Sequence, residues 1–129
     1  MKNAAGLLAM LLCASAVAAP PKHHSDDVLV WPTGEAKAGD RIDLATMAYT
    51  LHTSKRCSLP IVNAEQYHEL DVHSGTSQYV GCWGTTLNKS VVMVAPDGQK
   101  TIDSLAIFGR AIPNGDGSAT LQYPSYSSR

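Results

Sequence analysis

Residues 90–103 read SVVMVAPDGQKTID and carry the clearest hairpin signal in this 129-residue chain. A valine-rich run, Ser90 to Ala95, leads into Pro96-Asp97-Gly98, and Gln99 to Asp103 returns. Asp-Gly between two such runs is typical of the tight turns that join antiparallel strands, because glycine readily adopts the positive φ that these turns need. The stretch therefore predicts a β-hairpin.

A second hairpin is predicted immediately upstream. Tyr67 to His73 alternates in polarity, so that His68, Leu70 and Val72 face one way, and Tyr67, Glu69, Asp71 and His73 face the other. Residues 74–77, Ser-Gly-Thr-Ser, supply turn chemistry, and Gln78 to Trp83 forms the return strand. The alternation predicts one apolar inner face and one polar outer face for the first of these strands.

Further segments extend this sheet. Ile42 to Thr53 predicts a strand with apolar groups on both faces, and Val28 to Trp31 predicts an edge strand that Pro32 terminates. Ser104 to Phe108 is short enough to be a helical turn, and a helix at Asn63 to Leu70 is the main competing prediction. We therefore expect a mostly β fold, a small antiparallel sheet of hairpins with little helix.

The first eighteen residues have the pattern of a secretory signal peptide. Lys2 gives a positive start, Ala4 to Leu12 form an apolar run, and small residues follow. Ala16-Val17-Ala18 has the small residues that signal peptidase requires, which leaves Ala19 as the first mature residue. The apolar run is shorter than the about 20 residues of a membrane-spanning helix. We expect residues 1–18 to be removed and the mature chain to be exported, periplasmic or extracellular, without a transmembrane helix.

Cys13 leaves a second form of export open, because lipoprotein signals end at a cysteine that becomes acylated. The residue before such a cysteine is normally Gly, Ala or Ser, whereas Leu12 precedes Cys13. We favour a cysteine that is discarded with the signal peptide, with lipidation at Cys13 as the alternative.

Polar segments flank the predicted sheet at both ends. Residues 19–27 carry two prolines, two histidines and two aspartates without an apolar period. Residues 113–129 are rich in Gly, Ser and Tyr, and Leu121 is their only aliphatic side chain larger than alanine. Segments with so little apolar surface to bury stay disordered. We expect a flexible leader at 19–27, a single β-rich domain at 28–112 and a disordered polar tail at 113–129.

The charge balance argues against a nucleic acid or an anionic membrane as the partner. Ten basic and eleven acidic residues give the whole chain a net charge of −1, and removal of Lys2 makes it −2. Surfaces that bind nucleic acid or anionic lipid concentrate Lys and Arg. This sequence has no such concentration.

Cys57 and Cys82 are the two cysteines that remain after processing. An even, small number of cysteines in an exported chain predicts a disulfide, and closing a loop of this length stabilises a domain by about 3 kcal/mol in the chain-entropy model. The alternative is a catalytic cysteine with His52 or His68 as its base, although neither cysteine lies in a known nucleophile motif. We expect the disulfide, and thus a sheet closed by one covalent bridge.

Several histidines and carboxylates are candidates for metal binding or acid–base chemistry. His23 and His24, near Asp26 and Asp27, could supply nitrogen and oxygen ligands in the leader. His68 and His73 lie five residues apart, so on one strand they face opposite ways and cannot hold one ion. Glu69 and Asp71 share a strand face with Tyr67 and His73 and could act together in acid–base chemistry. The polar, solvent-exposed face of an ordinary strand has the same pattern of residues. We therefore assign no catalytic, cofactor-binding or metal-binding residue and expect no cofactor.

The two tryptophans are the candidate binding contacts. Trp83 follows Cys82, and we expect it to be buried against the disulfide, with a role as a binding anchor as the alternative. Trp31 lies beside Pro32 near the predicted edge of the domain, which makes it the better candidate for an exposed contact.

Cys57, then Gly81-Cys82-Trp83 and a valine-rich strand that ends in Asp97-Gly98, follow one another within residues 57–111. This pattern resembles small exported proteins of proteobacteria and their phages, in which a cysteine, a later Gly-Cys-Trp and a strand that ends in Asp-Gly recur. The resemblance implies the disulfide and the order of the hairpins. It implies no activity, cofactor or substrate, and the polar tail after Ile112 departs from the pattern.

The function expected from these observations is that of a non-enzymatic secreted or periplasmic interaction protein with an unidentified protein partner. No catalytic motif stands out, and an open sheet edge can pair with a strand of a partner. The alternative is a small enzyme or metal-binding protein that uses the Tyr67–His73 face.

Overall fold

The computed structural model describes residues 26–124. The predicted signal peptide, residues 19–25 of the predicted leader and residues 125–129 of the predicted tail lie outside the described residues.

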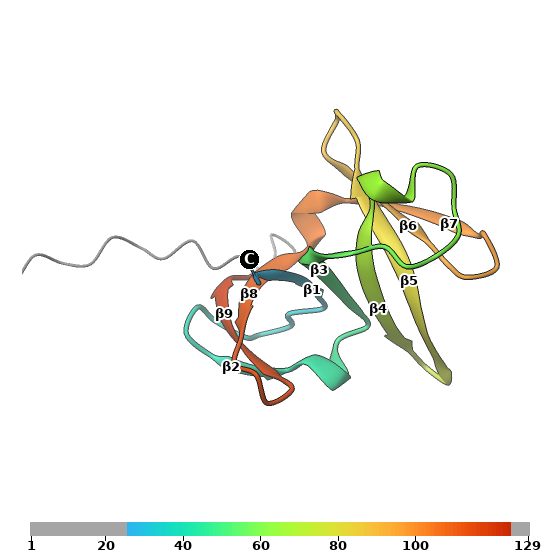
Figure 1. Ribbon diagram of the computed structural model, residues 1–129. Coiled ribbons are helices and arrows are strands. Elements are labelled where there is room, and N and C mark those ends of the chain that lie inside the picture. The colour runs from blue at the N-terminus through green and yellow to red at the C-terminus, as the bar shows by residue number, and fades with distance from the viewer. Residues whose placement is uncertain (1–25, 125–129) are drawn as a thin grey trace, which may run out of the picture.

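The described residues form one antiparallel sheet with short 3₁₀ helices between some of its strands (Figure 1). Its nine strands are β1 (Val28–Trp31), β2 (Arg41–Asp43), β3 (Tyr49–Arg56), β4 (His68–Ser74), β5 (Ser77–Thr85), β6 (Ser90–Val94), β7 (Lys100–Ser104), β8 (Gly109–Pro113) and β9 (Ser118–Tyr123). The 3₁₀ helices are η1 (Leu44–Thr46), η2 (Ala64–Gln66) and η3 (Leu105–Ile107). The strand order is β2-β9-β8-β1-β3-β4-β5-β6-β7. The predicted mostly β, antiparallel fold with little helix is confirmed.

Both predicted hairpins are present. In the β4–β5 hairpin Ser74 pairs with Ser77, and Gly75 between them has a φ of 59°. In the β6–β7 hairpin the backbone amide of Gly98, at a φ of 87°, donates to the Ala95 carbonyl at 2.9 Å. The Asp97 carboxylate accepts a further bond from the Gln99 amide at 3.0 Å. These hydrogen bonds and positive φ values are those expected for the tight turns that the sequence predicted.

Three of the predicted elements differ in the structure. The single strand expected from Ile42 to Thr53 is wrong, because the Asp43 carboxylate caps η1 by accepting from the Ala45 amide at 2.9 Å, which separates β2 from β3. The edge position expected for Val28 to Trp31 is also wrong, since β1 lies between β8 and β3. The alternative helix at Asn63 to Leu70 is limited to η2, and β4 begins at His68.

The boundaries expected for the domain are wrong at both ends. β9 lies within residues 113–129, which were expected to be disordered, and it pairs with both β2 and β8. Its Ala119 and Leu121 are 0% and 1% exposed. They lie two residues apart on the strand, so both side chains face the same core. At the other end Asp27, expected in the flexible leader, is 6% exposed and accepts a bond from Arg110 Nε at 2.7 Å.

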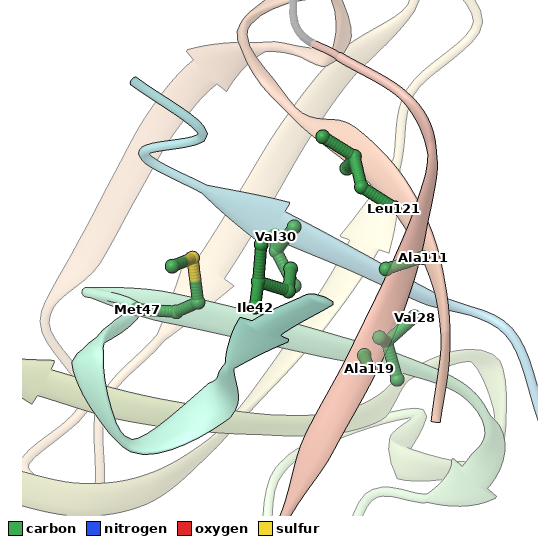
Figure 2. Close-up of a cluster of buried hydrophobic side chains, with 7 residues drawn as sticks. All are labelled: Val28, Val30, Ile42, Met47, Ala111, Ala119 and Leu121. Carbon is green, nitrogen blue, oxygen red and sulfur yellow. The ribbon is translucent and has the colours of Figure 1, made fainter. Parts of the chain in front are cut away.

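Two hydrophobic cores lie on opposite faces of the sheet. The first core lies among β1, β2, β8 and β9 (Figure 2) and consists of Val28, Val30, Ile42, Met47, Ala111, Ala119 and Leu121. The second core consists of Leu51, Leu70, Val72, Trp83, Val91, Met93 and Phe108. Val30 pairs with Thr50, whereas Leu51 points the other way, because side chains alternate along a strand. Each half of the sheet therefore buries a different face.

The predicted disulfide between Cys57 and Cys82 is present, with Cα atoms 5.3 Å apart. This distance lies within the range of about 4.4–6.8 Å that disulfides require. Because both sulfur atoms form the disulfide, neither cysteine has a free thiol, and the alternative of a catalytic cysteine is wrong. Within residues 26–124 no helix is long and apolar enough to cross a membrane.

Candidate functional site

A polar stripe runs along β3 and β4 on the same sheet face as the first core. The register pairs Val28 with His52 and Val30 with Thr50, and it pairs Thr50 with Asp71 on the other side. Glu69 and His73 flank Asp71 at spacings of two, so they share its face. We call this set the polar face: Thr50, His52, Glu69, Asp71 and His73.

A pocket with a cavity volume of about 710 Å³ borders the polar face. Thr50, Asp71 and His73 line it from β3 and β4. The remaining lining comes from β2, η1, the β8–β9 turn and the start of β9: Arg41, Ile42, Asp43, Leu44, Ala45, Asp116, Gly117 and Ser118. Segments that are distant in sequence therefore meet at this pocket, because β9 pairs with β2.

The centre of the polar face is a contact between a histidine and a carboxylate. His52 Nε2 lies 2.7 Å from Asp71 Oδ2, and the two side chains are 12% and 31% exposed. The backbone at His52 is held from the other side of the sheet, because Trp83 Nε1 donates to the His52 carbonyl at 2.9 Å. Asp71 thus joins the pocket to His52.

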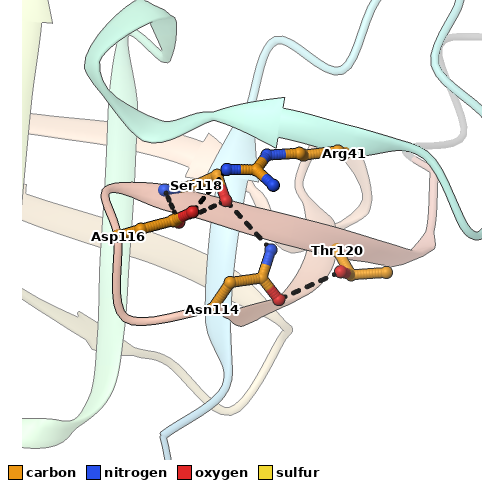
Figure 3. Close-up of polar contacts among 5 residues, drawn as sticks. All are labelled: Arg41, Asn114, Asp116, Ser118 and Thr120. Atoms are coloured by element: carbon orange, nitrogen blue, oxygen red, sulfur yellow. Dashed lines mark hydrogen bonds and ion pairs between the residues drawn. The ribbon is translucent and has the colours of Figure 1, made fainter.

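A hydrogen-bond network fixes the rim of the pocket at the β8–β9 turn (Figure 3). Asn114 Nδ2 donates to Ser118 Oγ at 3.0 Å, and Thr120 Oγ1 donates to Asn114 Oδ1 at 3.1 Å. The Asp116 carboxylate accepts from both the hydroxyl and the amide of Ser118 and forms an ion pair with Arg41. These interactions, the Ser118 hydroxyl first, lower the pKa of Asp116. Asp116 is therefore a carboxylate at neutral pH and is paired there with Arg41.

Two polar atoms beside Asp71 are buried without a hydrogen-bond partner among the described residues. They are Thr50 Oγ1 and His73 Nδ1, and Thr50 as a whole is only 1% exposed. Buried polar atoms are nearly always paired in native proteins, since an unpaired one costs stability. An unpaired hydroxyl at the wall of a pocket is therefore a feature that a bound ligand would satisfy.

The free-energy cost of burying the unpaired Thr50 hydroxyl can be measured. We expect Thr50→Val to raise the free energy of unfolding by about 1 kcal/mol, because valine has a similar shape and no unpaired polar atom. Thr53→Val is the matched control on the same strand, since the Thr53 hydroxyl donates to the Asp27 carbonyl at 2.6 Å. Chemical denaturation should show a loss of about 1 kcal/mol for the control. A loss for Thr50→Val would mean that its hydroxyl has a partner.

The structure brings together some of the residues that the sequence singled out. Asp71 and His73 line the pocket, and Glu69 shares their face, as the alternation indicated. His68 faces the other way, with its ring 5.5 Å from that of Trp83, as expected from its spacing to His73. His23 and His24 lie outside the described residues.

Other residues of the site were not identified from the sequence. From the sequence His52 is a candidate only as a base for a cysteine, and no local pattern connects it with Asp71. Strand alternation places Thr50 and His52 on one face, but the register against β4 shifts between Leu51 and Arg56. Arg41 and Asp116 reach the pocket through the unexpected pairing of β9.

Both tryptophans pack in the interior, but Trp83 is more fully buried than Trp31. Trp83 is 5% exposed and belongs to the second core, so its indole ring is not available to a partner in this structure. The expectation that Trp83 packs against the disulfide is wrong, because Trp83 follows Cys82 in β5 and its side chain therefore points to the opposite face. Trp31 packs partly buried against the second core, with its ring 5.7 Å from that of Tyr49. Its role as a binding contact stays a prediction.

No protein-family model, curated protein or solved structure matches this chain. The resemblance to small exported proteins therefore stays an expectation, and the function has to be inferred from the pocket and the polar face.

Proposed function

We propose that this chain is an exported, non-enzymatic interaction protein that holds a positively charged side chain of a protein partner in the pocket beside Asp71. The observation that carries the proposal is the acidic lining of a pocket whose wall includes an unpaired, buried hydroxyl. Its volume of about 710 Å³ is within the usual size of ligand pockets and exceeds what a single lysine or arginine side chain fills.

The charge of the lining favours a cation. Asp43, Asp71 and Asp116 line the pocket, against one permanently positive residue, Arg41. Asp116 is ionised at neutral pH, and its hydrogen bonds from Ser118 lower its pKa further. A partner's ammonium or guanidinium group would donate hydrogen bonds to these carboxylates and to the Thr50 hydroxyl.

The ion pair at the rim can be exchanged for a partner's cation. The Arg41 and Asp116 side chains are 68% and 48% exposed, so solvent screens their attraction. Such surface pairs contribute only about 0–1 kcal/mol. An incoming basic side chain can therefore take the place of Arg41 at little cost.

The arrangement of the polar face supports binding more than catalysis. A nucleophilic hydroxyl needs a base within hydrogen-bond distance. Thr50 Oγ1 has no such partner among the described residues, and His52 Nε2 contacts Asp71 instead. Both cysteines of the domain are in the disulfide. Export is supported by that disulfide, which persists in oxidising compartments, together with the signal-peptide pattern of residues 1–18.

Selection from a random peptide library tests the proposal although the partner is unidentified. Peptides selected on the protein should be enriched in lysine or arginine. Asp116→Asn should weaken their binding about fivefold, because one close charge interaction at an exposed site contributes about 1 kcal/mol. Added salt should reduce the difference, since exposed charges are screened.

Asp97→Asn is the matched control for this experiment. Asp97 and Asp116 each accept a hydrogen bond from the backbone amide two residues later, at 3.0 Å in both cases. Asparagine can preserve that bond in both turns and removes one charge in each. Binding by Asp97→Asn should therefore equal that of the parent protein. Selected peptides without basic residues, or equal binding by both variants, would refute the proposal.

A further inference from the structure

His52, Glu69 and Asp71 form a cluster of metal-ligating side chains within the polar face. One ligand atom from each residue lies within 4.8 Å of the other two. His52 comes from β3 and both carboxylates come from β4, where their spacing of two places them on one face. The cluster therefore rests on two paired strands and not on a flexible loop.

The surroundings of the cluster favour a defined site. The side chains of His52, Glu69 and Asp71 are 12%, 25% and 31% exposed, so they are partly shielded from water yet reachable by an ion. The backbone at His52 accepts a bond from Trp83, and Glu69 pairs in the sheet with Cys82, one end of the disulfide. The backbone beneath both residues is thus held in place by the second core and by the bridge.

A second observation points to a ligand at the same place. Thr50 pairs with Asp71 across the two strands, is 1% exposed and has an unpaired hydroxyl. His73, two residues after Asp71, has an unpaired buried Nδ1. Metal ligands and metal-bound waters usually take hydrogen bonds from such neighbouring groups. Thr50 therefore offers an unpaired hydroxyl next to Asp71, to which a water bound by an ion at Asp71 could form a hydrogen bond.

We propose that His52, Glu69 and Asp71 bind one divalent transition-metal ion, with Zn²⁺ as the ion of choice. Imidazole is a ligand for zinc and its neighbours and is not one that magnesium or calcium favours. Three protein ligands leave the fourth position of a tetrahedral zinc ion to water or to a partner's group. This inference does not rest on the proposed function, but the two share Asp71, so zinc and a partner's basic side chain would compete for that carboxylate.

Only small movements are needed to admit the ion. Ligands at about 2.1 Å from a tetrahedral zinc ion are about 3.4 Å apart. His52 Nε2 and Asp71 Oδ2, now 2.7 Å apart, therefore have to separate slightly while Glu69 moves in. The Lys55 ammonium, 3.9 Å from Glu69 Oε1, has to withdraw, which is easy because its side chain is 58% exposed.

Calorimetric titration with zinc chloride tests the site directly. The protein is purified from the cell envelope without a histidine tag, and His23 and His24 are replaced by alanine so that they do not add zinc sites. We expect one zinc ion per chain. His52→Gln, Asp71→Asn and Glu69→Gln should each lower the affinity about tenfold or more.

His68→Gln is the matched control, because His68 lies on the opposite face of β4 and packs against Trp83. Its zinc affinity should equal that of the parent. If a ligand variant does not fold, the histidine side-chain NMR signals of the parent protein decide instead, since zinc should shift His52 and leave His68 in place. Absence of zinc binding, equal affinity for parent and His52→Gln, or no shift of His52 would overturn the inference. Peptide binding in the presence of a chelator tests the proposed function separately.

Discussion

Replacing Leu121 with alanine should lower the free energy of unfolding by about 2–5 kcal/mol. Leu121 is 1% exposed and packs in the first core beside Val28, Val30 and Ala111 (Figure 2). Alanine would remove apolar contacts and leave a cavity, because the surrounding strands relax only partly. A domain of this size is stabilised by about 5–15 kcal/mol in total, so the loss would be a large fraction.

Gln122→Ala is the matched control for Leu121→Ala, because Gln122 is the next residue of β9 and is exposed. Its effect should stay within about 0.5 kcal/mol, as is usual for surface substitutions. Urea denaturation of both variants measures the difference. Equal, small effects would mean that β9 contributes little to the stability of the sheet.

The two hairpins were predictable because their information is local. Asp97-Gly98 and the residues around Gly75 specify their turns within a few residues, and the paired strands follow directly. The places of β1 and β9 are different, since Val28 pairs with Ala111 and Ile42 pairs with Ala119. No local pattern encodes which distant strand lies beside β1, so its position at the centre of the sheet was missed.

The β8–β9 hairpin was missed for another reason. Asn114-Gly115-Asp116-Gly117 contains Asn-Gly, a typical turn dipeptide, and Asp-Gly, which also forms the β6–β7 turn, and its glycines have positive φ values of 85° and 86°. Low apolar content led to the expectation of disorder after Ile112. A strand between two neighbours needs few large side chains, however, and the small Ala119 with Leu121 supplies the inward face of β9.

The difference between local patterns and long-range strand pairing also explains how much of the site was predictable. Glu69, Asp71 and His73 were grouped correctly, because their spacing on one strand fixes their face. Their association with His52 depends on the β3–β4 register, and the contribution of Arg41 and Asp116 depends on the β2–β9 pairing. Sites built from several strands are therefore visible in the sequence only as separate polar residues.

Removing the Cys57–Cys82 bridge should lower the free energy of unfolding by about 3 kcal/mol. The bond closes a loop over a sequence separation of 25 residues and connects the segment after β3 to the centre of β5. Without it the unfolded chain gains conformational entropy, which is the main source of the loss in the chain-entropy model. The double variant Cys57→Ala, Cys82→Ala and the reduced parent protein should lose similar amounts.

Two comparisons separate the bridge from the packing of its cysteines. Reductant should lower the melting temperature of the parent and leave that of the double alanine variant unchanged, because the variant has no disulfide in the domain to reduce. Cys82 is 0% exposed, so in the Cys57→Ala background Cys82→Ser should cost about 1–3 kcal/mol more than Cys82→Ala by burying a hydroxyl. A parent protein whose stability is insensitive to reductant would show that the sheet holds its loop without the bond. The stability of the domain would then rest on its two cores.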